Sequence, residues 1–402
     1  MPARLRRTRV SVAVSFAILG MAEGMWVARI PAVKHALHLS DGLLGVALLA
    51  APAGLVLVVL LAGRLVDAFG SSRLTRLSGV AVALLPIGLG LAVNMATLMV
   101  ALLAFGIAAG LLDVAMNAQA GEVERRLGRP LMSSFHACYS FGGLAGALLG
   151  GLFAWAGIGP LPMFLAAGPP LAILAAGTGR WLLPERAEPP VPAPSAGPAA
   201  APGPSRMARR LLVLGLLAFC CMVGEGAAGS WSAVYLRDNL GTSAGFAAIG
   251  FAAFSLTMAF GRLFGDRLAA RFGPAALLRG CGLLAAAGLA AGLIIASPVA
   301  GVAGFAVFGA GLSCTVPQLF SAAGNADPGR RGAGIARVAG LGYLGVLTGP
   351  VLIGGCASLV GLPRALGIPV LLLLIVAASA GALRGTGVSR PRSRNSLGSG
   401  MP

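Results

Sequence analysis

The chain has 402 residues, of which 57% are hydrophobic and only 10% are charged, and its formal net charge is +18. An ordinary soluble domain has about a quarter charged residues, so this composition excludes a soluble globular protein and, despite the positive charge, a nucleic-acid-binding one. A helical membrane protein fits, because twelve hydrophobic spans of about 20 residues would occupy about 240 residues and leave room for loops and tails.

Twelve apolar runs of membrane length follow one another along the chain, separated by clusters of Gly, Pro and Arg. The first six cover residues 10–31, 42–63, 76–94, 97–120, 132–155 and 161–181. The other six cover 211–236, 244–262, 276–296, 298–324, 333–356 and 364–383. These runs are too long for barrel strands and lack polar alternation. We therefore expect an all-α membrane protein with twelve transmembrane helices in two pseudo-symmetric six-helix bundles.

A stretch rich in Pro, Ala, Gly and Ser separates the two sets of runs, at residues 182–210. Such a composition cannot pack a core and predicts an extended linker. The chain is thus expected to form an N-terminal bundle at 1–181, the linker at 182–210, a C-terminal bundle at 211–384 and a disordered tail at 385–402.

The positions of the basic residues predict the orientation. Only four of the 30 Lys and Arg residues fall on the side opposite the N-terminus, and these are Arg29, Lys34, Arg237 and Arg364. The others lie in the termini, the linker and the loops on the N-terminal side. By the positive-inside rule, we expect both termini and the linker to be cytoplasmic.

The two halves carry related segments about 200 residues apart. In the first half Gly63 and Arg64 are followed by Asp67, Gly70 and Arg73; in the second half Gly261 and Arg262 are followed by Asp266, Arg267 and Arg271. Glu23 precedes Trp26 in the first span, as Glu225 precedes Trp231 in the seventh. A parallel six-helix repeat with a binding site between the halves is typical of secondary transporters.

With this layout and loop motif, the sequence resembles the Major Facilitator Superfamily over essentially the whole chain apart from the linker and tails. Gly63, Asp67, Gly70 and Arg73 match the family motif between spans two and three, although Ala68 stands where the family has a basic residue. The stretch from Asp113 to Ala120, continuing to His136 and Ser140, is similar to the fucose-permease-like branch and its uncharacterised bacterial inner-membrane relatives. The resemblance implies a multi-pass transporter of the bacterial cytoplasmic membrane that moves a sugar-like or other small polar solute by alternating access.

Ionisable side chains at membrane depth are functional candidates, because a charge buried in lipid costs about 3 kcal/mol or more. Glu23 lies near the middle of the first span, Glu225 lies at the equivalent depth of the seventh, and Asp113 lies in the fourth with Asn117 one turn later on the same face. The resemblance implies that Glu23 and Asp113 line a central cavity, bind substrate and exchange protons. The alternative is that these carboxylates are permanently paired and only hold helices together.

Four further side chains are candidates for the cavity. His136 could relay protons or could simply be hydrogen-bonded to another helix. Trp26 and Trp231 could stack on a sugar-like substrate or belong to the aromatic belt near the outer interface. Gln318, beside Pro317 in the tenth span, is a further cavity candidate.

The loop motifs form a second candidate site. The resemblance implies that their charged residues make interhelical contacts that hold the cytoplasmic gate in one state. A charged loop that only sets topology is the alternative. The residues concerned are Gly63, Arg64, Asp67, Gly70, Arg73, Gly261, Arg262, Asp266, Arg267 and Arg271.

Several segments match motifs of soluble enzymes in spacing, but their surroundings in the sequence exclude those functions. Residues 340–345 have the spacing of a dinucleotide fingerprint but lie in an apolar span with no preceding strand. The single lysine, Lys34, is not part of a Walker A loop, so the energy source within the chain is an ion or substrate gradient. His35, His38 and Asp41 are spaced for a metal but lack a fourth ligand. We expect no enzymatic activity, cofactor, metal or nucleic-acid partner; the expected partners are a small-molecule substrate, protons and the lipid bilayer, and the expected state is a monomer.

Two other functions remain open. Export of drugs or metabolites by proton antiport is a close alternative, although the glycines from Gly142 to Gly146 lack the proline of the span-five motif found in many drug exporters of the superfamily. A non-transporting membrane sensor would require a large folded soluble part, which neither the Pro-rich linker nor the short tail supplies.

Overall fold

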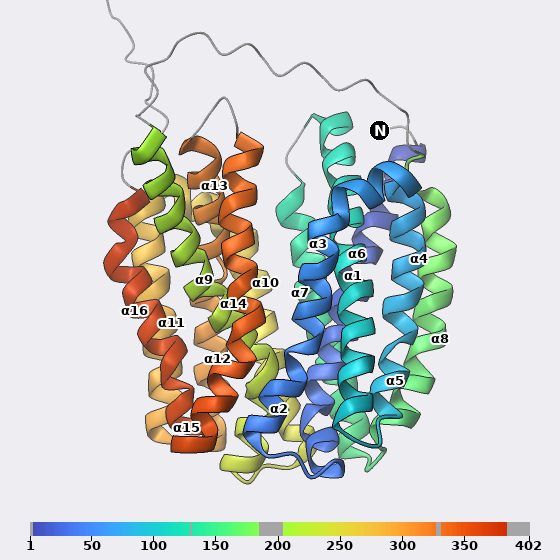
Figure 1. Ribbon diagram of the computed structural model, residues 1–402, viewed down its shortest axis with the longest axis vertical. Coiled ribbons are helices and arrows are strands. Elements are labelled where there is room, and N and C mark those ends of the chain that lie inside the picture. The colour runs from blue at the N-terminus through green and yellow to red at the C-terminus, as the bar shows by residue number, and fades with distance from the viewer. Residues whose placement is uncertain (1–2, 129–130, 185–203, 327–330, 384–402) are drawn as a thin grey trace, which may run out of the picture.

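The computed structural model describes residues 3–128, 131–184, 204–326 and 331–383 (Figure 1). Within these ranges the ordered elements are helices without any strand, and twelve helical segments are long and apolar enough to cross a membrane. The predicted class and number of spans are therefore confirmed. Most of the predicted linker, at 185–203, and the predicted tail, at 385–402, lie outside the described residues.

The first bundle contains six spans, three of which are continuous helices. Their elements are α1 (Ala3–Ala36), α2 (Asp41–Leu48) with α3 (Ala50–Phe69), α4 (Ser71–Leu84) with α5 (Pro86–Gly90), α6 (Met95–Leu127), α7 (Met132–Trp155), and α8 (Pro160–Thr178) with η1 (Gly179–Trp181). The break between α4 and α5 falls at Pro86, because proline has no N–H for the helix ladder.

The second bundle repeats this plan. Its elements are α9 (Pro204–Val234) with the π-helical turn η2 (Tyr235–Asn239), α10 (Ala244–Phe272), α11 (Pro274–Ile295), α12 (Pro298–Leu312) with α13 (Thr315–Ala326), α14 (Arg331–Val360), and α15 (Leu362–Ala365) with α16 (Gly367–Ala378) and η4 (Ser379–Leu383). Several helices run beyond the predicted apolar runs, and α10 ends ten residues after Arg262. Hydropathy marks the part of a helix that matches the lipid, whereas the backbone hydrogen bonds continue into polar sequence.

One glycine makes the turn after the second span in each half. Gly70 joins α3 to α4 with a φ of 83°, and Gly273 joins α10 to α11 with a φ of 80°. Positive φ at these values is readily adopted only by glycine. The two motif-bearing turns thus have the same local geometry, as the internal repeat predicts.

Helices α1 and α7 pack closely along a stripe of glycines. A Cβ atom placed on Gly142 would lie 2.2 Å from the carbonyl oxygen of Ala17, and one on Gly146 would lie 2.1 Å from that of Met21. The two backbones can come this close only because the glycines of the stripe have no side chains. The close approach brings the middle of α1 against α7, where the carboxylate of Glu23 finds its partner.

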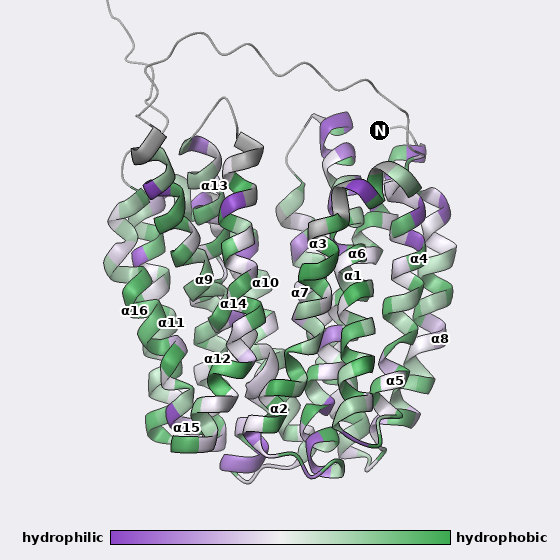
Figure 2. Cartoon of the chain, viewed as in Figure 1, coloured by the Kyte–Doolittle hydropathy of each residue, from purple (hydrophilic) through white to green (hydrophobic). Residues whose placement is uncertain are grey.

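The two bundles stand side by side, and Figure 1 shows their helices as two groups. Helix α7 packs against α10, and α2 packs against α14. Figure 2 shows apolar residues over the middle of the helices and polar residues gathered toward both ends, as expected for a membrane-spanning protein. We call the end of the bundles where α1 begins and α8 stops the linker end. We call the opposite end, which carries the turn at 37–40, the far end.

Candidate functional site

Glu23 of α1 is held by a tyrosine from α7. The hydroxyl of Tyr139 donates a hydrogen bond to Oε2 of Glu23, and both side chains are half-buried. Tyr139 lies where the two helices touch, since a Cβ atom on Gly20 would lie 2.0 Å from the Tyr139 carbonyl oxygen. The tyrosine therefore orients the carboxylate at the face of the first bundle.

Arg262 of α10 joins the second bundle to this face. Its Nη1 donates to Oγ of Ser140, the neighbour of Tyr139, over 3.0 Å, and its Nη2 lies 3.7 Å from Oε2 of Glu225. The other oxygen of Glu225, Oε1, is buried and accepts no hydrogen bond from the described residues. A guanidinium has several donors in a fixed fork, so Arg262 can contact α7 and α9 at once.

This position of Arg262 corrects the sequence analysis, which placed it in a cytoplasmic loop. The residue lies inside α10, and its side chain is only 15% exposed. The motif was read as a loop because the apolar run ends at residue 262, but the helix continues and the long side chain reaches back toward Glu225. Within the described residues, Arg262 thus lies among polar side chains in the interior of the protein.

Asp113 of α6 forms a second contact between the bundles. Nδ2 of Asn117 donates to Oδ1 of Asp113 over 3.0 Å, which confirms that the two lie on one helix face. Tyr343, on α14 of the second bundle, has its hydroxyl beside the Asp113 carboxylate. The glycine-rich stretch at 340–345 lies within α14, and its tyrosine, Tyr343, is the residue that reaches the site.

These contacts belong to one electrostatic neighbourhood. Glu23 and Asp113 lie within electrostatic range of each other, and Tyr139 and Tyr343 both lie within range of Glu225. We call Glu23, Asp113, Asn117, Tyr139, Ser140, Glu225, Arg262 and Tyr343 the interface cluster. Its carboxylates are held by hydroxyl, amide and guanidinium donors, which is how buried charge is tolerated.

Sequence reasoning found the acids of this cluster but missed Tyr139 and Tyr343 and misplaced Arg262. The chain has only three tyrosines and all three lie in the predicted apolar runs, which was a usable signal. A buried tyrosine hydroxyl needs a polar partner, which points to a nearby acid without saying which one.

The other predicted cavity residues are not hydrogen-bonded through their side chains to the described members of the cluster. His136, one turn from Ser140 on α7, lies within electrostatic range of Arg262 and packs edge-on against Phe16 with ring centroids 5.1 Å apart. Trp26 and Trp231 are 6% and 0% exposed and belong to the main hydrophobic cluster, so neither forms an interfacial belt. Gln318 is buried on α13, which packs against α9 and α14. Packing of α9 against α14 covers the Trp231 ring, since its Cζ2 would lie 3.1 Å from a Cβ on Gly354.

Apart from Gly70, the residues predicted to form the loop motifs lie on the helices α3, α4 and α10 toward the linker end, because these helices continue beyond the apolar runs, and only part of the motifs can be described. The side chains of Asp67 and Asp266 and the surroundings of Gly63 lie outside the described residues. Arg64, Arg73 and Arg267 are exposed, and the guanidinium of Arg271 lies 5.4 Å from the ring centroid of Phe272. A Cβ on Gly261 would lie 2.1 Å from Oγ of Ser313, so this glycine allows α10 to pack on α12.

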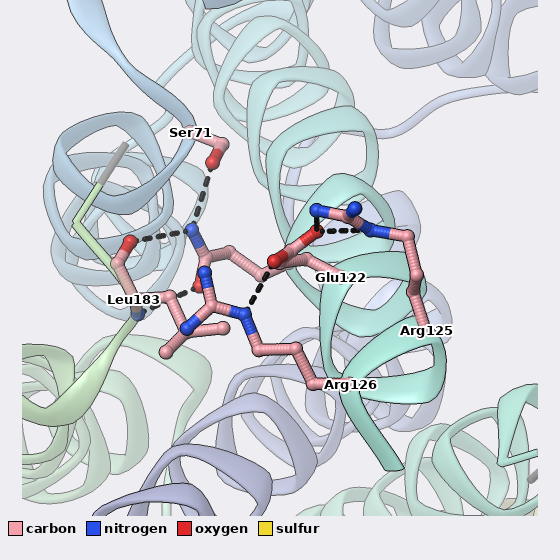
Figure 3. A network of polar contacts seen from close by, with 6 residues as sticks. Ser71, Glu122, Arg125, Arg126 and Leu183 are labelled. Carbon is pink, nitrogen blue, oxygen red and sulfur yellow. Dashed lines mark hydrogen bonds and ion pairs between the residues drawn. The ribbon is translucent and has the colours of Figure 1, made fainter. Parts of the chain in front are cut away.

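Beside the first motif, Gln119 of α6 fixes the chain where it leaves the first bundle, and Figure 3 shows its bonding partners Ser71 and Leu183. Its Nε2 donates to Oγ of Ser71 over 2.8 Å and to the carbonyl of Leu183 over 3.0 Å, and the Leu183 N–H donates back to its Oε1. One turn further along α6, Glu122 pairs with Arg125 and Arg126. The first residues of the linker are thus bonded to the turn that carries the motif.

Metal binding has no support in the part of the chain that the structure describes, where no three His, Cys, Asp or Glu side chains are grouped as ligands. His35 directs its Nε2 to Asp238, at 2.8 Å, and so is engaged by a carboxylate of the other bundle.

Comparisons with known proteins agree on one family. The family model described as the Major Facilitator Superfamily matches residues 12–325 and 214–400. The chain is 37% identical over 382 residues to an uncharacterised MFS-type transporter of Yersinia pestis, covering 93% of this chain and 95% of that protein. It is 36% identical over 362 residues to the membrane protein MosC of Rhizobium meliloti, covering 89% and 86%. A crystal structure of the nucleoside transporter NupG shares the fold with a TM-score of 0.72 at 10% identity, covering 94% of this chain and 100% of that one.

Proposed function

The chain belongs to the Major Facilitator Superfamily and is a multi-pass membrane transporter of that family, and on this premise we propose that it moves a small polar solute, sugar-like or another polar metabolite, by alternating access coupled to protons. The two bundles rock about the interface cluster and expose it to one side of the membrane at a time. The observation that supports this most directly is Arg262, which contacts Ser140 of one bundle and Glu225 of the other.

In this proposal the carboxylates of the cluster act on substrate and protons. A carboxylate held between the bundles keeps its partners only while the bundles keep their arrangement, so its interactions change when they rock. Glu23 is hydrogen-bonded to Tyr139 within the first bundle. Asp113 lies beside Tyr343 of the other bundle, and Glu225 lies beside Arg262, which contacts both bundles. Proton uptake by such a group would link the membrane gradient to the rocking step, since one charge moved through 100 mV is worth about 2.3 kcal/mol.

We also propose that both termini and the linker are cytoplasmic, that the protein resides in the bacterial cytoplasmic membrane and that it works as a monomer. Among the described residues, basic side chains gather at the linker end while four, Arg29, Lys34, Arg237 and Arg364, belong to the far end, and this asymmetry supports the orientation.

The test has two stages because the solute is not named by the geometry. A ligand-stabilisation screen of the purified protein at two pH values identifies a solute, and its uptake into proteoliposomes is then measured with and without an imposed pH gradient. Glu23→Gln should abolish gradient-driven uptake, while Glu122→Gln, which removes an exposed carboxylate at the linker end, should leave it intact. Gradient-driven uptake that survives in Glu23→Gln would refute the coupling role of Glu23. Accumulation against the opposite gradient would identify the proton-antiport exporter instead.

A further inference from the structure

Away from the interface cluster, four ionisable side chains meet at the far end and join the bundles. Nζ of Lys34, near the end of α1, lies 2.6 Å from Oδ1 of Asp41 at the start of α2, in the same bundle. The same Nζ lies 2.5 Å from Oδ2 of Asp238, in η2 of the second bundle. Nε2 of His35 lies 2.8 Å from the other oxygen of Asp238. Asp238 is thus held by two side chains of the opposite bundle.

Local structure places these groups, and Lys34 and Asp238 are partly shielded from water, whereas the side chain of His35 is 52% exposed. Ser40 caps α2 and puts Asp41 in its first turn, and the π-helical turn η2 extends α9 to bring Asp238 over α1. The side chains of Lys34 and Asp238 are 11% and 17% exposed. An ion pair shielded to this degree is screened less than a surface pair, so its removal has a measurable effect.

The two bundles also approach each other closely at this end. A Cβ on Gly45 of α2 would lie 2.7 Å from the carbonyl oxygen of Pro350 of α14, and one on Gly354 would lie 2.8 Å from that of Asp41. On the other side, a Cβ on Gly245 of α10 would lie 2.9 Å from Cβ of Trp155. The far end is therefore shut in this structure, and the ion pairs lie across the seam.

We propose that Lys34 and His35 together with Asp238 form a latch that keeps the far end shut, and that Lys34 passes from sharing Asp41 and Asp238 to Asp41 alone when this end opens. Asp41 travels with Lys34 because both belong to the first bundle. The only lysine of the chain therefore keeps a carboxylate partner in both states, and opening does not leave its ammonium unpaired. This inference rests on the proposed alternating access, and it is independent of the substrate and of proton coupling.

His35 adds a contact to Asp238 that does not depend on Lys34, since its Nε2 lies 2.8 Å from Oδ1 of Asp238. A hydrogen bond to a carboxylate is stronger than one between neutral groups, so we expect His35 to help keep the far end shut. His38, three residues further along the chain, is exposed and makes a matched control.

Hydrogen–deuterium exchange of the full chain in nanodiscs tests the latch without a substrate or a gradient. Asp238→Asn should speed exchange at the far end, in segments 36–45 and 235–243, by about fivefold or more, and should slow exchange at the linker end, in segments 68–76 and 268–276. Asp41→Asn keeps the pair between the bundles and should change neither end by as much.

The outcomes separate a latch from a structural contact. Faster exchange at both ends of Asp238→Asn would mean general destabilisation, and unchanged exchange would mean that the pair holds nothing; either overturns the proposal. An effect of Asp41→Asn equal to that of Asp238→Asn would overturn the transfer of Lys34 between partners. His35→Phe should speed exchange at the far end by less than Asp238→Asn does, and His38→Phe should leave it unchanged. Exchange in His35→Phe equal to that of the wild type would refute the role of His35.

Discussion

Replacing Arg262 with methionine removes the one described guanidinium that contacts both bundles in the interface cluster. Removing one partner of a fully buried ion pair costs about 3–5 kcal/mol, whereas an exposed pair is worth about 0.2–1 kcal/mol. Arg262 and Glu225 fall between these limits, because their side chains are 15% and 28% exposed and the charged atoms are 3.7 Å apart. After this discount for solvent, we expect a loss of about 1 kcal/mol from the ion pair and about 1 kcal/mol from the hydrogen bond to Ser140.

A double-mutant cycle isolates the contribution of the ion pair. We expect Arg262→Met to lower the unfolding free energy by about 2 kcal/mol, and Glu225→Gln in the same background to cost less than it does alone, with a coupling of about 1 kcal/mol. Reversible unfolding in detergent, followed by tryptophan fluorescence, measures all four variants. Arg267→Met, which removes an exposed arginine five residues further along the same helix, is the matched control and should change the unfolding free energy by less than about 0.5 kcal/mol.

The result that would refute this reasoning is additivity. If the effects of Arg262→Met and Glu225→Gln sum within about 0.3 kcal/mol, the two charges do not interact and Arg262 does not tie α9 to α7. An equal loss in Arg267→Met would likewise show that any arginine on α10 stabilises the protein through its net charge.

Three further predictions concern single contacts. Gly146→Ala should lower the unfolding free energy by about 1–3 kcal/mol, because the new Cβ would meet the backbone of α1 at 2.1 Å, while Gly280→Ala, whose Cβ would meet nothing within 4 Å, should be neutral or stabilising in the same unfolding assay. Tyr343→Phe should cost about 1 kcal/mol by thermal unfolding because Asp113 loses a donor, whereas Tyr235→Phe removes a buried hydroxyl without a described partner and should cost nothing; equal losses would refute the Tyr343 contact. Gln119→Leu should speed hydrogen exchange at the Leu183 amide and lower the unfolding free energy by about 2 kcal/mol, and an unchanged rate at Leu183 would show that the linker exit is held by something else.

Much of the fold followed from the sequence because lipid imposes a strong and local constraint. A run of about 20 apolar residues must form a helix that satisfies its own backbone, so the number of spans and their order along the chain could be counted. The internal repeat is also visible in the structure, since Gly70 and Gly273, which follow the second span of each half, adopt similar positive φ values. The ends of the helices were less predictable, and the error at Arg262 came from equating the end of an apolar run with the end of a helix.

The acids of the interface cluster were predictable for the same reason. Glu23, Asp113 and Glu225 stood out because an ionisable group in an apolar span is costly unless it has a partner. The partners themselves were not predictable. Tyr139 lies 116 residues from Glu23 in the chain, and Ser140 lies 122 residues from Arg262.

The sequence by itself determined that this protein crosses the membrane twelve times in two related halves and which of its acids lie within the spans. Only the tertiary structure decided which helix faces meet. It therefore decided that Arg262 contacts Ser140 and lies beside Glu225, that Tyr343 lies beside Asp113, and that Lys34 pairs with both Asp41 and Asp238. The physical reason is that hydropathy fixes how deep a residue lies in the bilayer, whereas the rotation and separation of helices are set by packing, such as the glycine stripe between α1 and α7, which involves residues distant in sequence.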